Sequence, residues 1–127
     1  MLTITPIYVG LLAILFFWQS LRISLKRLKG FGSDDSKKEV LRLAVRAQGN
    51  SSEYIPLGLI ILLVLELQGA PGGLVHVFGI ALLAGRLGHF AGFDLMPHRL
   101  LRQVSIVLTY AVMCFGGLAV LWFALVS

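Results

Sequence analysis

The sequence predicts an all-α membrane protein, a bundle of four transmembrane helices, from its composition, its apolar segments and the placement of its charges. Hydrophobic residues make up 57% of the 127 positions and charged residues only 13%, against about 45 to 50% and roughly 25% in soluble domains. A helix needs about 20 apolar residues to cross a bilayer. Four segments meet that requirement, and we expect one domain over 1–127 with spans near 5–25, 40–67, 73–93 and 104–126.

The three links between these spans differ in character. The first, KRLKGFGSDDSKK, is polar and contains Gly and Ser; the second, QGAPGG, predicts a tight turn; the third, DLMPHRLL, places Pro97 at a helix boundary. The N-terminal MLTITPIYVG has no basic residue before its apolar run. We therefore expect a retained first span and not a signal peptide.

All Lys and Arg residues lie in the first link, the third link or the helix halves that adjoin them. By the positive-inside rule, the first and third links face the cytoplasm and both termini face the opposite side. We expect Lys26, Lys29, Lys37 and Lys38 to set this topology and do nothing further. The basic residues are not interleaved with aromatic ones on a polar face, so we expect no nucleic-acid binding.

Cysteine and histidine give no sign of a metal or redox site. Cys114 is the single cysteine and lies in an apolar run, which indicates a packing role. The three histidines lack the spacing of a metal site on paired helices, so we expect no metal. Near the second link, Glu66 and His76 are expected to be solvated at the membrane interface.

Polar residues also lie inside the second and third spans. Arg46, Asn50 and Glu53 are spaced by four and three residues, which places them on one helix face, and Arg86 and His89 share a face of the next span. Counting at ~1.5 Å per residue from the tight link puts Glu53 and Arg86 at about the same depth. We therefore expect an ion pair between them.

The outer spans supply polar groups at a similar depth. Arg102, Ser105 and Thr109 follow one another at helical spacing in the fourth span, and Arg22 lies at the end of the first. Deep arginines then outnumber Glu53, taken as the one deep acid, so an anion is needed, and guanidinium groups suit carboxylates and phosphates. The plain alternatives are an interhelical lock for Glu53, a helix-to-helix hydrogen bond for Asn50 and simple packing for His89.

Two motifs resemble one family. They are R-A-x-x-N-x-x-E-x-x-P, formed by Arg46, Ala47, Asn50, Glu53 and Pro56, and G-R-x-x-H, formed by Gly85, Arg86 and His89. Together with four spans and a basic first link, they resemble the MAPEG superfamily, the membrane-associated proteins in eicosanoid and glutathione metabolism, in its small bacterial branch. The resemblance implies a homotrimer in the inner membrane that binds glutathione between neighbouring subunits near the cytoplasmic side.

The resemblance also implies roles for individual residues. Glutathione-contacting positions are matched by Arg22, Arg46, Asn50, Glu53 and His89, with Arg86 a further member of the motif. Arg102 resembles the arginine that activates the thiol, and Ser105 is a nearby hydroxyl.

The function implied is a glutathione-dependent transferase or peroxidase acting on hydrophobic electrophiles, with a thiolate stabilised by arginine. The alternative is a non-catalytic scaffold of the same fold that binds a lipid or fatty acid. A small transporter is disfavoured, because the sequence shows no inverted repeat or broken pair of helices.

Overall fold

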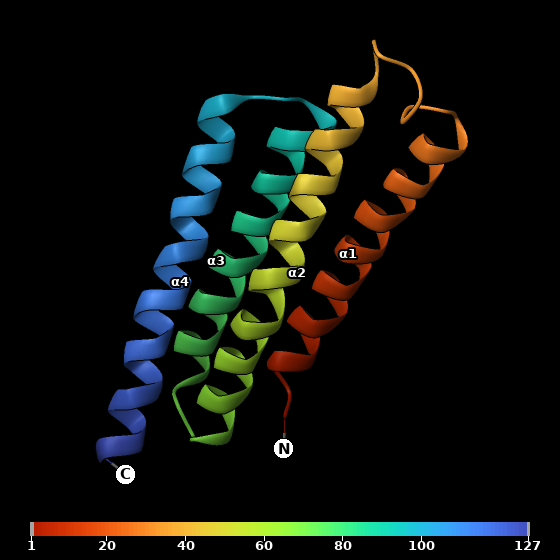
Figure 1. The fold of residues 1–127 in the computed structure, drawn as a ribbon. Coiled ribbons are helices and arrows are strands. Elements are labelled where there is room, and N and C mark those ends of the chain that lie inside the picture. The colour runs from red at the N-terminus through yellow and green to blue at the C-terminus, as the bar shows by residue number, and fades with distance from the viewer. Residues whose placement is uncertain (1, 127) are drawn as a thin grey trace.

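The computed structural model describes residues 2–126, and this part of the chain forms four long helices and one short π-helix (Figure 1). The elements are α1 (Thr5–Leu28), α2 (Lys38–Leu67), α3 (Gly72–Phe90), the π-helix η1 (Ala91–Leu95) and α4 (Arg99–Val126). Within the described residues, four helices are long and apolar enough to cross a membrane, with η1 extending α3. The predicted four-helix membrane fold is confirmed.

The helices extend beyond the predicted spans wherever a span meets a basic link. The first helix continues to Leu28, the third reaches Leu95 through η1, and the fourth begins at Arg99 instead of near 104. At the ends of the first and fourth helices, basic residues continue the helical backbone while their long side chains reach toward the polar region. At the end of the third, the added residues are Asp94 and Leu95. The apolar pattern therefore underestimates each helix at its charged end. The helical structure is interrupted in the third link where expected, around Pro97.

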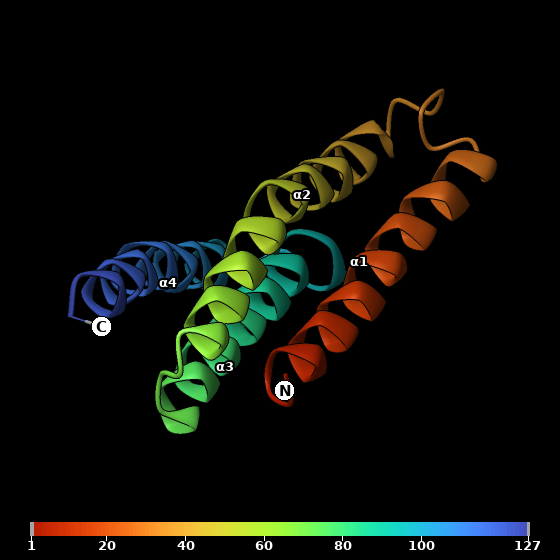
Figure 2. The same ribbon diagram turned by 90° about the horizontal axis from the view of Figure 1, so that it is seen from below.

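The helices run alternately up and down, and the two ends of the bundle differ (Figure 1). The first and third links lie at one end, which we call the link end. Both termini and the tight turn between α2 and α3 lie at the other, which we call the terminal end. Seen along the bundle, α2 and α3 lie between α1 and α4 (Figure 2). Helices α2, α3 and α4 contact one another, and α1 contacts α2 and α3.

Close contact between helices is made possible by glycines on α3. A Cβ atom added at Gly79 would lie 2.4 Å from the ring of Tyr8 on α1, and one added at Gly88 would lie 2.1 Å from Oγ of Ser105 on α4. The missing side chains let α1 and α4 approach from two sides, as small residues do in membrane bundles. Side chains on the inner faces are buried as a result, including the core residues Leu12, Leu82 and Val112.

At the terminal end, polar side chains are bound within the protein. The carboxylate of Glu66 accepts backbone N–H groups from Ile4 and Thr5, both at 2.8 Å, and from Thr3 at 2.9 Å. It thereby satisfies donors at the start of α1 that have no helical partner. The Tyr8 hydroxyl lies 2.8 Å from Nδ1 of His76. These bonds of Glu66 and His76 within the protein were not predicted from the sequence.

Candidate functional site

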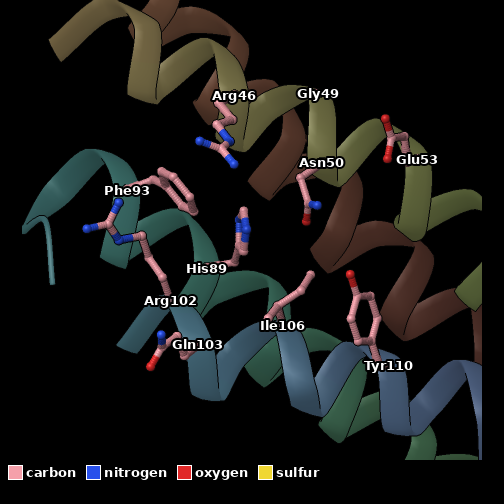
Figure 3. Close-up of a pocket in the computed structure, with 10 residues that line it drawn as sticks. All are labelled: Arg46, Gly49, Asn50, Glu53, His89, Phe93, Arg102, Gln103, Ile106 and Tyr110. Atoms are coloured by element: carbon pink, nitrogen blue, oxygen red, sulfur yellow. The ribbon is translucent and has the colours of Figure 1, made fainter. Parts of the chain in front are cut away.

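A groove of about 430 Å³ lies near the link end of the bundle, between α2, the end of α3 with η1, and α4 (Figure 3). It is lined by Arg46, Gly49, Asn50, Glu53, His89, Phe93, Arg102, Gln103, Ile106 and Tyr110. Five residues predicted for the site are therefore brought together, namely Arg46, Asn50, Glu53, His89 and Arg102. What each of them does stays a prediction.

The ring of Phe93 organises the basic side of the groove. The Arg102 guanidinium carbon lies 4.8 Å from the centre of this ring and that of Arg46 lies 5.8 Å away, while the His89 ring is at 4.6 Å between centroids. Cations are attracted to the face of an aromatic ring. Phe93 is part of η1, so the π-turn fixes where this platform lies relative to α2 and α4.

Arg86 lies outside the groove and is fully buried. Its Nη1 donates a hydrogen bond to Oδ1 of Asn50 at 2.7 Å, and its guanidinium carbon lies 5.8 Å from the centre of the Tyr54 ring. Glu53 is exposed and forms no ion pair with it. The predicted Glu53–Arg86 pair was therefore wrong. The depth of Arg86 was estimated to within one helical turn, but its partner is Asn50, one turn from Glu53. The alternative of a helix-to-helix hydrogen bond for Asn50 is thereby confirmed.

Arg22 is likewise not in the groove. Its Nε lies 3.0 Å from Oδ2 of Asp94, and Nζ of Lys26 lies 2.8 Å from Oδ1 of the same carboxylate, whose side chain is only 2% exposed. Glu53 is therefore not the one deep acid, as the sequence had suggested. An acidic residue directly after the third apolar segment, opposite the basic end of the first, was the signal that could have identified Asp94.

Ser105 and Thr109 are buried on the face of α4 that meets α3. Neither lines the groove. Within one chain, Ser105 is therefore not positioned to contact a thiol bound there, contrary to what the resemblance implies. The side of α4 that does line the groove carries Arg102, Gln103, Ile106 and Tyr110. The last three were not predicted. Their signal is the spacing of Arg102, Ile106 and Tyr110 by four residues, which continues one helix face toward the membrane interior.

The charged groups of the groove are not neutralised inside the protein. Across residues 2–126, neither Arg46, Arg102 nor Glu53 forms an ion pair or a side-chain hydrogen bond. Nε of Arg102 and Nδ1 of His89 are buried without a hydrogen-bond partner. Native proteins rarely leave such groups unsatisfied, because each costs free energy. The groove is therefore suited to a polar ligand that carries negative charge.

Fold and site together define an integral membrane protein of four helices with a cation-rich groove at one end. The sequence matches the model of the MAPEG family over residues 5–123, so the chain belongs to the MAPEG family. It is similar to the inner membrane protein YecN of Escherichia coli strain K12 and to YecN of Escherichia coli O6:H1 strain CFT073. Each is 35% identical over 116 residues, which cover 90% of this chain and 85% of the relative. No solved structure matches the chain.

Proposed function

We propose that this protein binds glutathione in the groove and joins its thiolate sulfur to a hydrophobic electrophile. The observation that carries the proposal is the set of unpaired charges. Two guanidinium groups, those of Arg46 and Arg102, and the one carboxylate of Glu53 line the groove without an ion-pair partner in the part of the chain described. Together they give the groove a net charge of one positive unit.

Glutathione has the complementary set of charges. It carries two carboxylates and one ammonium group, and thus one net negative charge. In the proposed complex Arg46 holds a carboxylate, because a guanidinium group binds carboxylates through paired N–H donors. Glu53 binds the ammonium group. Oδ1 of Asn50 accepts a hydrogen bond from Arg86, which leaves its amide N–H donors for a peptide carbonyl.

Arg102 supplies the chemistry in this proposal. A guanidinium group beside the sulfur favours the thiolate, which is the nucleophile, so the thiol proton leaves to solvent. With an aryl halide, a carbon–sulfur bond forms, the carbon–halogen bond breaks, and halide departs with the bonding electron pair. The ring of Phe93 holds Arg102 from one side at 4.8 Å, which limits the positions that the guanidinium group can take.

An apolar groove supports the second half of the proposal. It begins one turn beyond Glu53 on α2 and about one turn beyond Tyr110 on α4, and has a volume of about 560 Å³. Its lining includes Leu57, Met113 and Cys114. A polar groove followed by an apolar one along the same two helices suits a polar thiol and an apolar electrophile that arrives from the lipid.

The assembly and the orientation belong to the same proposal. We infer a homotrimer in the inner membrane, with the link end in the cytoplasm, because the two basic links lie together at that end and both termini lie at the other. The predicted contact between Arg22 and glutathione stays a prediction that requires a neighbouring subunit, because Arg22 binds Asp94 within its own chain.

A fatty-acid-binding scaffold is the second candidate, favoured by the apolar groove. There a carboxylate head would bind Arg46 and Arg102 and the acyl chain would extend along Leu57 and Met113. In that case Glu53 would have no counterpart on the ligand. The first proposal uses every charge in the groove, and the second does not.

The test is conjugation of glutathione to an aryl halide by the purified protein in detergent. We expect turnover that falls roughly a hundredfold in Arg102→Ala, because a preorganised charge beside the reacting atom is removed. The matched control is Arg99→Ala, which removes an exposed arginine of the same helix that does not line the groove. Equal activities in the two variants would remove Arg102 from the mechanism. Absence of both turnover and glutathione binding would favour the scaffold.

A further inference from the structure

We infer a second binding site, for the phosphate headgroup of an anionic membrane lipid, at the link end of α1. The structure has a pocket of about 220 Å³ there, lined by Arg22, Leu25, Lys26, Lys29 and Phe31. Three of these five side chains are cationic. None of the five lines the groove proposed for glutathione.

The local sequence explains how this pocket forms. Arg22, Lys26 and Lys29 are spaced by four and three residues and therefore share one face of α1. Gly30 has φ of +80°, and the N–H groups of Gly30 and Phe31 donate to the carbonyls of Arg27 and Lys26, both at 3.1 Å. This is the Schellman arrangement that ends a helix, and glycine takes the left-handed position without a steric cost. The reversal brings Phe31 back over the basic face as a wall.

The charges of the pocket are only partly neutralised. Asp94 binds Nε and Nη2 of Arg22 and one N–H of Lys26. Nη1 of Arg22 and two N–H donors of Lys26 remain, and the side chain of Lys29 has no ion pair or hydrogen bond within residues 2–126. Three cations against one carboxylate leave two positive charges around a space that a phosphate group fits. Nζ of Lys37 lies 5.0 Å from the centre of the Phe31 ring and adds a further cation behind the wall.

The surroundings indicate a lipid and not a free phosphate. Large apolar side chains of α1 are exposed below the pocket, including Phe17, Leu21 and Leu25, the last of which also lines it. Acyl chains can lie along these residues while the headgroup reaches the lysines. Basic pockets at the cytoplasmic ends of transmembrane helices bind anionic headgroups in this way. A role of Lys26 and Lys29 in topology alone would not require Phe31 to fold back over them.

The experiment measures lipid binding to the full-length protein in detergent. Phosphatidylglycerol, phosphatidylcholine and inorganic phosphate are added at equal concentrations, and native mass spectrometry counts the bound molecules. We expect phosphatidylglycerol to bind in preference to the other two. Lys29→Ala should weaken its binding about fivefold, the effect of one basic residue at a membrane surface.

The matched control is Arg27→Ala. Arg27 is an exposed cation of the same helical turn that does not line the pocket, so its loss changes the net charge equally and should reduce binding less than twofold. Equal losses in the two variants would show general surface attraction and overturn the site. Equal binding of phosphatidylcholine, or binding of inorganic phosphate as tight as that of the lipid, would overturn the assignment to an anionic lipid. None of these measurements involves a thiol, so they stand apart from the proposed transferase activity.

Discussion

Charged groups at the terminal end of the bundle and charged groups in the groove near the link end are paired in opposite ways. At the terminal end, the carboxylate of Glu66 accepts three backbone N–H groups of the first helix and its approach, and Tyr8 is bonded to His76. At the link end, Arg46, Arg102 and Glu53 line an open groove with no ion pair in the part of the chain described, and Nδ1 of His89 has no partner there. Both ends are built from the same helices.

The difference separates a structural role from a binding role. A charged group whose hydrogen bonds are complete within the fold stabilises it, and little is left to bind a ligand. A charged group that is fixed in place but unpaired costs stability, and a ligand of opposite charge recovers that cost. Some neutral atoms at the terminal end, such as Oγ1 of Thr5, also lack partners. No charged group there does so within residues 2–126.

The largest effect on stability is expected for Asn50→Leu. Asn50 provides the one side-chain hydrogen bond to Arg86 in the described part of the chain, and Nε and Nη2 of that guanidinium already lack partners. Its loss leaves a fully buried charge uncompensated, so the unfolding midpoint in detergent should fall by roughly 10 °C. The double variant with Arg86→Met, which replaces both partners with apolar groups, should recover most of this loss. An equal or larger loss in the double variant would contradict this account of Arg86.

Glu66→Ala should lower the midpoint by about 5 °C, because three N–H groups at the start of α1 lose their acceptor. Glu66→Gln, whose amide oxygen still accepts hydrogen bonds, should lose less. Glutathione binding should be unchanged in both variants, since Glu66 lies one residue before the end of α2 at the tight turn and does not line the groove. A midpoint in Glu66→Ala equal to that of the wild type would show that the carboxylate does not hold the first helix.

A smaller loss, about 3 °C, is expected for Tyr8→Phe. The substitution removes the hydroxyl that lies 2.8 Å from His76 and keeps the ring that packs against Gly79. Thermal unfolding followed by tryptophan fluorescence measures the change. A fall in the midpoint as large as that of Glu66→Ala would contradict this account, because the loss of the bond to His76 does not explain so large an effect.

The smallest effect on stability is expected for Glu53→Gln, with a midpoint within about 1 °C of the wild type, because exposed charges contribute little. Glutathione affinity should nevertheless fall roughly tenfold, since the ligand ammonium loses its carboxylate. Calorimetric titration in detergent measures this affinity. A marked loss of stability would instead favour the ion pair with Arg86 that the sequence alone suggested.

The sequence predicts the fold and the second-helix face of the groove, because both follow from regular spacing. Arg46, Asn50 and Glu53 lie on one face as their separations require, and apolar length identified four helices. Where two residues lie at a similar depth on one helix, the sequence could not predict which of them contacts a given partner. Asn50 and Glu53 are one turn apart, and which of them meets Arg86 depends on helix rotation. Similarly, Arg102 shares one face of α4 with Ser105, three residues on, and another with Ile106, four residues on. The spacing alone could not decide which of these faces lines the groove. In the structure Ile106 lines it and Ser105 is buried.

Asp94 shows a second limit. Its role depends on η1, where a π-turn at the end of α3 places a carboxylate against Arg22 and Lys26. No periodic pattern in the sequence indicates such a turn. The same turn places Phe93 between Arg46 and Arg102, so both the basic side of the groove and the pocket at the end of α1 depend on it.

The most direct test of the central claim compares glutathione with its diethyl ester in calorimetric titrations of the purified protein. The ester keeps the thiol and the ammonium group but has no free carboxylate. If the unpaired Arg46 of the groove holds a carboxylate, glutathione binds at least about tenfold more tightly than the ester, and Arg46→Ala removes most of that difference. Equal affinities for the two compounds, or no binding of either, would contradict the account.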